Sequence, residues 1–224
     1  MIPRLRSRAR GEAVWLRHSP LTSEEIRQAV YEAAKACFLS DGIAATEMKK
    51  IAADIGIGRS TLYRYFPSKE LLAVLVAAEM IDGLLFADLV PRIDPALNGY
   101  GRTRAFFALY IERLRERPDV LRFFLEYDSM LSRGNSDFPE RRAFEARVFA
   151  DIEGIAAFVR QGQADLSVRP DVEPVAFTIM LVNSAVGLAQ RFLTHTTGEG
   201  ERYGLDISML LRLQTDLILR AIKA

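Results

Sequence analysis

The sequence contains a single cysteine and two histidines, which limits the chemistry it can carry. Cys37 alone cannot form an internal disulfide or a multi-cysteine metal site. Neither His18 nor His195 stands in an HExxH or paired-ligand pattern, and the sequence has no GxGxxG or phosphate-binding loop. We therefore expect no catalytic residue, no metal and no cofactor, so the protein is not predicted to be an enzyme. A catalytic carboxylate is the enzymatic alternative that the residues leave open.

Long hydrophobic runs are also missing. The longest uncharged run, residues 174–190, has 17 residues and includes Thr178, Asn183 and Ser184, so it is too short and too polar to predict a membrane span. We interpret it as a buried helix. The first 19 residues carry five arginines but no apolar stretch of signal-peptide length. The sequence therefore predicts a cytoplasmic protein without a membrane partner.

The sequence does contain a basic N-terminal third. The formal net charge is +1, but residues 1–70 hold twelve lysines and arginines against eight acidic residues, whereas residues 71–224 are acidic overall. This excess favours an anionic partner for residues 1–70, although most charged side chains simply solvate a surface.

Apolar residues recur at intervals of three and four along the chain, without strand-like alternation or internal repeats. This pattern predicts an all-α fold of about nine helices. The expected helices cover residues 22–41, 46–54, 58–66, 69–89, 101–116, 118–132, 139–165, 172–195 and 206–222.

The first expected helix has clear start signals. Thr22 and Glu25 are spaced as a capping box, with Leu21 and Ile26 as a hydrophobic staple. Its predicted core stripe is Ile26, Ala29, Val30, Ala33, Cys37 and Phe38, which favours Cys37 as a small buried hydrophobe over a reactive thiol. Thr46 is expected to cap the second helix.

The segment GIGRSTLYRYFPSKELL, residues 56–72, combines a glycine turn with basic and aromatic residues. On a helix starting near Gly58, Leu62 and Phe66 fall on the inner side. The outward side carries Arg59, Ser60, Tyr63 and Arg64, flanked by Thr61 and Tyr65. Two helices joined by a short glycine-containing turn are the arrangement that places the second helix in the major groove of DNA. The alternative is that the two tyrosines are only half-buried aromatics.

The segment of about residues 26–72 resembles the TetR-type transcriptional regulators. The matching residues are Ile26, Ala33, Phe38, Gly42, Thr46, Ile51-Ala52, Gly56-Ile57, Thr61-Leu62-Tyr63, Tyr65-Phe66 and Lys69-Glu70-Leu71-Leu72. The resemblance implies an all-helical homodimer with an N-terminal helix-turn-helix DNA-binding domain and a helical ligand-binding and dimerisation domain behind it. It also implies that a small molecule usually relieves repression.

By position, the resemblance implies roles for individual residues. It places Lys49, Arg59, Ser60 and Tyr63 near base edges of double-stranded DNA. It places Thr46, Thr61, Tyr65 and Lys69 near phosphates, and the outward Arg64 completes the predicted DNA-binding set. Two positions depart from the family: Glu47 stands where a second small hydroxyl residue is frequent, and Lys50 where an acidic residue is frequent.

We expect three parts along the chain. Residues 1–20 form a basic arm, residues 21–70 the helix-turn-helix domain, and residues 71–224 the ligand-binding and dimerisation domain. For the arm, the sequence leaves three interpretations open: a segment in the minor groove, a disordered tail, or a start codon assigned too far upstream.

The second domain contains the candidate ligand-binding residues. Aromatic side chains recur there at helical spacing, and two polar residues interrupt the apolar run in residues 172–195. The predicted pocket residues are Phe106, Tyr110, Phe123, Tyr127, Phe144, Asn183 and Ser184. Aromatic stripes of this kind are also typical of an ordinary core. Glu126, Asp128 and Arg147 are further polar neighbours, and their charges do not decide whether the effector is acidic or basic.

The expected helix 172–195 has no fully polar side, and the expected helix 206–222 carries apolar residues over roughly half of its circumference. We expect each to pair with its copy in a four-helix homodimer interface, although they could instead complete the core of a monomer. The predicted function is a repressor that a small, largely apolar effector releases from a palindromic operator. An apolar-ligand carrier without DNA activity would not explain the outward Arg59, Ser60 and Tyr63.

Overall fold

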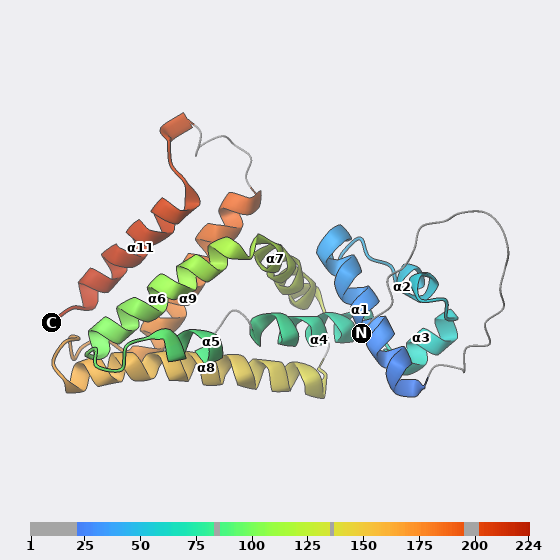
Figure 1. Ribbon diagram of the computed structural model, residues 1–224, viewed down its shortest axis with the longest axis horizontal. Helices are drawn as coiled ribbons and strands as arrows, with labels where there is room; N and C mark the ends of the chain where they lie inside the picture. The colour runs from blue at the N-terminus through green and yellow to red at the C-terminus, as the bar shows by residue number, and fades with distance from the viewer. Residues whose placement is uncertain (1–21, 83–85, 135–136, 195–201) are drawn as a thin grey trace.

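The computed structural model describes residues 22–82, 86–134, 137–194 and 202–224, and these residues form an all-helical protein (Figure 1). The elements are α1 Ser23–Asp41, α2 Met48–Asp54, α3 Arg59–Tyr65, α4 Lys69–Asp82, α5 Phe86–Leu89, the 3₁₀ helix η1 Val90–Arg92, α6 Gly99–Glu116, α7 Pro118–Arg133, α8 Pro139–Ala164, α9 Pro174–Thr194 and α11 Ile207–Ile222. Within these ranges the β pairing is a single isolated bridge between Val168 and Lys223. The predicted all-α fold is confirmed.

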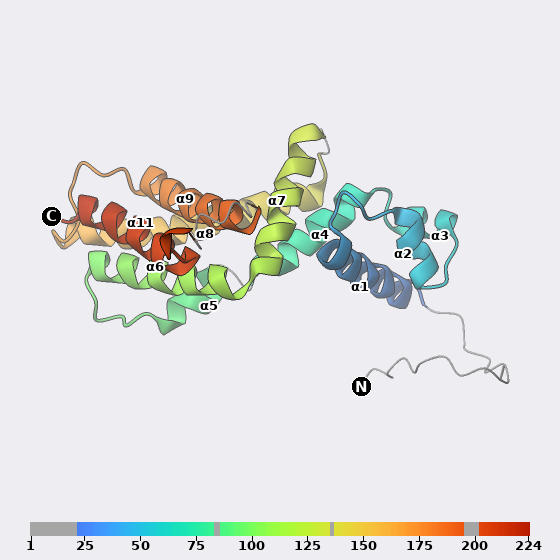
Figure 2. The same ribbon diagram turned by 90° about the horizontal axis from the view of Figure 1, so that it is seen from above.

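The helices form two lobes joined by α4 (Figures 1 and 2). One lobe contains α1, α2 and α3. In the other lobe, α8 packs against α6 and α9, and α11 packs against α6 and α9. Helix α4 contacts α1 on one side and α7 and α8 on the other. A hydrophobic core runs through both lobes and across α4, so the two lobes are packed together and not merely tethered.

Helix α1 begins as the sequence predicts. The Thr22 hydroxyl accepts from the Glu25 amide, and the Glu25 carboxylate accepts from the Thr22 amide at 2.7 Å. The predicted partner of the staple, Leu21, lies outside the described residues, as do the N-terminal arm and His195. Cys37 is buried, and burial raises the pKa of its thiol, as expected for a core residue. Ala34 is fully buried although the periodicity favoured Ala33.

The structure describes the predicted helix 69–89 in two parts. Helix α4 is described to Asp82 and α5 covers Phe86–Leu89, while residues 83–85 between them lie outside the described residues. The structure also does not use Thr46 to cap α2. The N-cap is Glu47, without a side-chain cap, and the Thr46 hydroxyl donates instead to the Gly42 carbonyl at 2.7 Å.

Gly42 determines the path between α1 and α2. Its φ of 87° and ψ of 158° belong to a region that only glycine adopts readily. The space beside its Cα is also occupied by Glu126 of α7: a Cβ at position 42 would stand 2.8 Å from Oε2 and 2.9 Å from Cδ of that carboxylate. The backbone conformation therefore requires glycine, and a larger residue would also displace the Glu126 carboxylate.

We expect Gly42→Ala to lower the free energy of unfolding by about 1–3 kcal/mol. The turn fixes a positive φ at position 42, and alanine is strained in that backbone conformation. Chemical denaturation measures the loss. The Glu126→Ala exchange in the same background should recover the part caused by the collision and leave the part caused by φ. A Gly42→Ala protein as stable as the parent would contradict this account of the turn.

Candidate DNA-reading surface and effector pocket

Helix α3 has a buried inner face and an exposed outer face. Leu62 is fully buried and Phe66, its C-cap residue, is 4% exposed, so these two side chains anchor the helix against the first lobe. On the outer face, the exposed side chains are Arg59, Ser60, Tyr63 and Arg64, while Thr61 and Tyr65 are half-buried. The structure therefore gives α3 the polar, basic outer face that the sequence predicts.

A shallow hollow of about 280 Å³ lies beside this outer face. It gathers Lys49 of α2, Arg59 and Tyr63 of α3 and Lys69 of α4, so four candidate DNA-binding residues from three helices meet there. The hollow also contains Glu47, which forms an ion pair with Lys49 at 2.7 Å. Lys49 is the main cause of the lowered pKa of Glu47, with smaller contributions from Arg59 and Lys69. Glu47, the acidic residue that departs from the family pattern, therefore lies next to Lys49 and near Arg59 and Lys69.

Lys69 has a role that the sequence did not reveal. Its ammonium donates to three backbone carbonyls of the loop before α2: Ile43 at 2.7 Å, Ala44 at 3.2 Å and Thr46 at 3.0 Å. An ammonium has three N–H donors, so these bonds can use all of them. The structure therefore favours Lys69 as a clamp on residues 43–46 over the predicted phosphate contact.

Two other predicted phosphate contacts are also engaged within the protein. Thr46 is 1% exposed and its hydroxyl donates to a backbone carbonyl, so the side chain is not presented to the surface. The Tyr65 hydroxyl donates to Ser23 Oγ at 3.2 Å, and its ring lies beside the guanidinium of Arg27, 5.5 Å from the centroid. Tyr65 therefore ties α3 to the start of α1. The sequence gave no signal for this contact between Tyr65 and α1.

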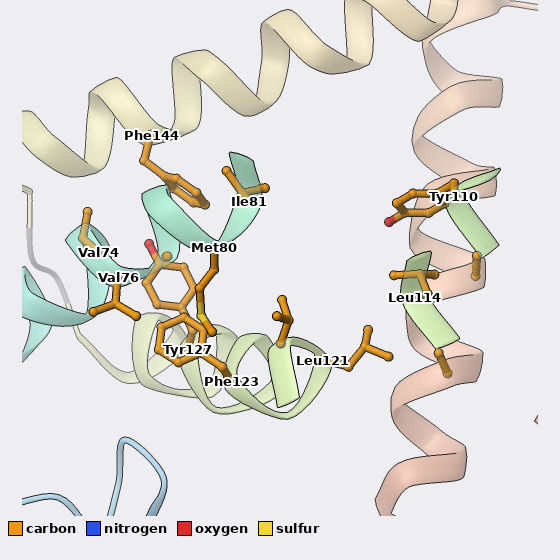
Figure 3. Close-up of a cluster of buried hydrophobic side chains, with 14 of the residues drawn as sticks. Val74, Val76, Met80, Ile81, Tyr110, Leu114, Leu121, Phe123, Tyr127 and Phe144 are labelled. Carbon is orange, nitrogen blue, oxygen red and sulfur yellow. The ribbon is translucent and has the colours of Figure 1, made fainter. Parts of the chain in front are cut away.

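A second cavity, of about 230 Å³, lies in the other lobe between α4, α6, α7, α8 and α9. We call it the effector pocket. Of the predicted pocket residues, Tyr110, Tyr127, Phe144 and Asn183 line it. Figure 3 shows Tyr110 on α6 facing across this region, with its hydroxyl toward Ile81 and Leu121, while Tyr127 and Phe144 lie together beside α4.

The structure places the other three predicted pocket residues outside this lining. Phe106 is fully buried and stacks on Tyr110, with ring centroids 6.1 Å apart. Phe123 packs toward the first lobe, with its ring centroid 6.4 Å from that of Phe38 on α1. The Ser184 hydroxyl donates to the Leu181 carbonyl at 3.0 Å. Helical spacing identified these residues as inward-facing but could not separate core from cavity wall.

The polar groups of the effector pocket come from two tyrosines, two aspartates and Asn183. The Tyr127 hydroxyl is buried without a hydrogen-bond partner among the described residues, and burial raises its pKa to about 12. Burial also raises the pKa of Tyr110 and of Asp128. Asp128 of α7 and Asp151 of α8 both line the pocket. The sequence showed Asp128 only as a neighbour of the aromatic stripe and gave no signal for Asp151.

Glu126, two residues before Asp128, faces the opposite way. Its carboxylate accepts from the Ala44 backbone amide at 3.0 Å, across the boundary between the two lobes. It also lines a crevice of about 320 Å³ that includes Ile43, Ala44 and Lys69. Helix α7 therefore contacts the effector pocket with one face and the loop before α2 with another.

An apolar surface remains open on α9 and α11. Among the described helices, α9 is long and apolar enough to cross a membrane, a property that core helices of globular proteins share. Of its apolar segment Pro174–Phe192, 28% is buried in the single chain. The exposed large apolar side chains on the two helices are Ile179, Met180, Met209, Leu213 and Leu217. Contiguous exposed apolar surface of this kind is typical of interaction sites.

Comparison with known proteins agrees with this architecture. The profile described as "Bacterial regulatory proteins, tetR family" matches residues 30–76. The chain is 28% identical over 110 residues to an uncharacterized HTH-type transcriptional regulator of Mycobacterium tuberculosis, covering 49% of this chain but only 42% of that protein. It is 27% identical to the HTH-type transcriptional repressor KstR2 of Mycolicibacterium smegmatis, covering 79% of this chain and 78% of the relative. The structure of the ketosteroid transcriptional regulator KstR2 of M. tuberculosis has a TM-score of 0.60 at 20% identity, covering 89% of this chain and 95% of that one.

The different surroundings of Arg59 and Lys69 predict different mutant behaviour. We expect Arg59→Ala to relax the preference at one base position by about 1–3 kcal/mol and to leave the melting temperature unchanged, because its guanidinium is exposed. We expect Lys69→Met to lower the free energy of unfolding by about 1.5–3 kcal/mol, the range for hydrogen bonds to charged groups, and to weaken binding to every DNA sequence alike. Binding to a randomised DNA library and thermal denaturation give the two readouts. Uniform weakening by Arg59→Ala would remove that residue from base reading.

Proposed function

We propose that the chain is a DNA-binding transcriptional regulator of the TetR type, and that it is a homodimeric repressor that leaves a palindromic operator when a small, largely apolar molecule fills the effector pocket. We further propose that it acts in the cytoplasm, on double-stranded DNA. The repressor assignment is supported by the M. smegmatis relative, which is described as a transcriptional repressor.

The observation that carries this proposal is the outer face of α3. Arg59 and Tyr63 stand exposed on a seven-residue helix whose opposite side is anchored by Leu62. A helix so anchored can enter the major groove with its polar side chains toward base edges. The adjacent lysines and arginines favour phosphate binding.

The exposed surface of α9 and α11 supports the homodimer. Its apolar side chains belong to two neighbouring helices, and pairing with their copies would bury them in a four-helix interface. Gly187 faces open space in the single chain and would permit close approach of a second copy. Two-fold symmetry in turn suits a palindromic operator.

The connection between the two sites supports effector-controlled release. Helix α7 contributes Tyr127 and Asp128 to the effector pocket and Glu126 to the hydrogen bond with Ala44. Helix α4 contributes Ile81 to the same pocket and Lys69 to the clamp on residues 43–46. A ligand that shifts α7 or α4 would therefore move the loop before α2, and a dimer set to groove spacing tolerates little change in the separation of its α3 helices.

We expect a dimer to require two half-sites whose centres are about 34 Å apart, one helical turn of DNA or a multiple of it. Inserting half a turn between the half-sites should abolish tight binding because the two α3 helices would then face opposite sides of the duplex. Gel shift and analytical ultracentrifugation measure affinity and stoichiometry. Equally tight binding of one chain to an isolated half-site would contradict the dimeric reader.

We expect Glu126→Ala to weaken the coupling between effector and operator, since it removes the acceptor for the Ala44 amide. In the parent protein, an effector and operator DNA should weaken each other's binding by the same factor, typically about 5–150-fold. Compounds that raise the melting temperature of the parent protein serve as effectors, and calorimetry with and without operator measures the factor. The matched control is Glu153→Ala on α8, whose carboxylate pairs with Arg160 away from the junction. If the coupling is unchanged in Glu126→Ala, the contact between Glu126 and Ala44 does not transmit the effect of the effector to the operator site.

A further inference from the structure

The charged side chains that line the effector pocket are both carboxylates. Asp128 comes from α7 and Asp151 from α8, and the described lining contains no lysine, arginine or histidine. Asp128 remains partly exposed at the surface of the molecule while its carboxyl borders the apolar wall. The pocket therefore offers a positively charged ligand an opposite charge beside an apolar interior.

Aromatic rings surround the same region. Phe124 and Tyr127 are edge to face, with centroids 5.9 Å apart, and Tyr127 and Phe144 are also edge to face at 5.8 Å. Tyr127 also stacks on Phe123, with centroids 6.0 Å apart, whereas Phe124 is half-buried and keeps part of its ring accessible. The face of an aromatic ring carries partial negative charge and attracts cations, more strongly where water is excluded.

A buried hydroxyl without a partner adds an independent sign of a ligand. Tyr127 is 2% exposed, and its hydroxyl has no hydrogen-bond partner among the described residues. Leaving such a group unpaired costs about 1–3 kcal/mol, so a ligand that supplies a partner recovers stability. The hydroxyl can accept from an N–H donor as well as donate.

The charges near Tyr127 on the other side do not reverse this preference. Arg141 lowers the pKa of Tyr127, whereas Glu145 and Asp128 raise it. Arg141 and Glu145 form an ion pair at 2.8 Å, so their charges largely offset each other. The carboxylate of Asp128 remains as the charge that faces the pocket from α7.

We propose that the effector is an organic cation, with an apolar body among the aromatic rings and an ammonium group against Asp128. The volume of about 230 Å³ equals that of about eight liquid water molecules, which suits a body the size of one aromatic ring. This inference rests on the proposed effector function and specifies the charge of the ligand. The Asp128 carboxylate has no hydrogen-bond or ion-pair partner among the described residues, so it opposes an anion, and a neutral molecule would leave it unpaired.

The test uses three probes with the same phenyl body and different head groups: phenethylamine, phenethyl alcohol and phenylacetate. Calorimetry on the full chain at fixed salt measures each affinity. We expect the amine to bind about tenfold or more tightly than the alcohol, and phenylacetate to bind weakest. We expect Asp128→Asn to reduce amine affinity about tenfold and to leave the alcohol unchanged, because the exchange removes the charge and keeps the shape.

Two further variants keep the result interpretable. Asp128→Lys should reverse the order, so that phenylacetate binds better than the amine. Glu153→Gln removes a carboxylate that pairs with Arg160 outside the pocket, and it should leave all three affinities unchanged. The proposal is overturned if the alcohol or phenylacetate binds the parent chain as tightly as the amine does. It is also overturned if no probe binds at millimolar concentration, or if Asp128→Asn weakens all three probes equally.

Operator binding on the same samples separates this inference from the proposed function. Fluorescence anisotropy with labelled genomic fragments, with and without phenethylamine, gives the second readout. Amine binding that leaves operator affinity unchanged would overturn the effector role while the cation site stands. Operator release by phenylacetate and not by phenethylamine would overturn the cation assignment while the regulatory function stands.

Discussion

The loop of residues 42–46 is the constraint on which the arrangement of the two lobes depends. Lys69 of α4 holds its carbonyls from one side, and Glu126 of α7 accepts from the Ala44 amide on the other. Gly42 permits both contacts because it has no side chain in the space that the Glu126 carboxylate occupies. The start of α2, and with it the position of α3, is therefore set by helices that also wall the effector pocket.

The second lobe leaves part of its apolar surface uncovered in the single chain. Its core includes Phe106, Phe107 and Leu181, which are fully buried, yet α9 and α11 keep large apolar side chains at the surface. Apolar area of this kind stabilises a protein only when it is removed from water. The proposed dimer would supply that burial and would fix the distance between two α3 helices, so association and DNA reading would depend on the same two helices.

Much of the fold follows from local sequence. The capping box at Thr22, the glycine turn before α3 and Ser68, whose hydroxyl accepts from the Leu71 amide, mark helix ends through contacts between near neighbours in the chain. The outer face of α3 follows from the helical period alone. The predicted cap at Thr46 was wrong, because Glu47 is the N-cap of α2 and the Thr46 hydroxyl donates to the Gly42 carbonyl. Spacing reports which residues can cap a helix or face inward, but the partner that a side chain binds depends on packing.

The sequence by itself determined the all-helical fold, the helix-turn-helix segment and the resemblance to TetR-type regulators, because periodicity, caps and turns are properties of consecutive residues. Only the tertiary structure decided which inward residues line a cavity and which fill the core. Tyr127 borders the pocket, whereas Phe123, one turn earlier on the same helix, packs toward Phe38. The tertiary structure also places Glu126 against the loop before α2 and Asp128 at the pocket, and it directs the Lys69 ammonium to the loop carbonyls. These assignments depend on residues 23 or more positions apart in the chain, and no local pattern records such contacts.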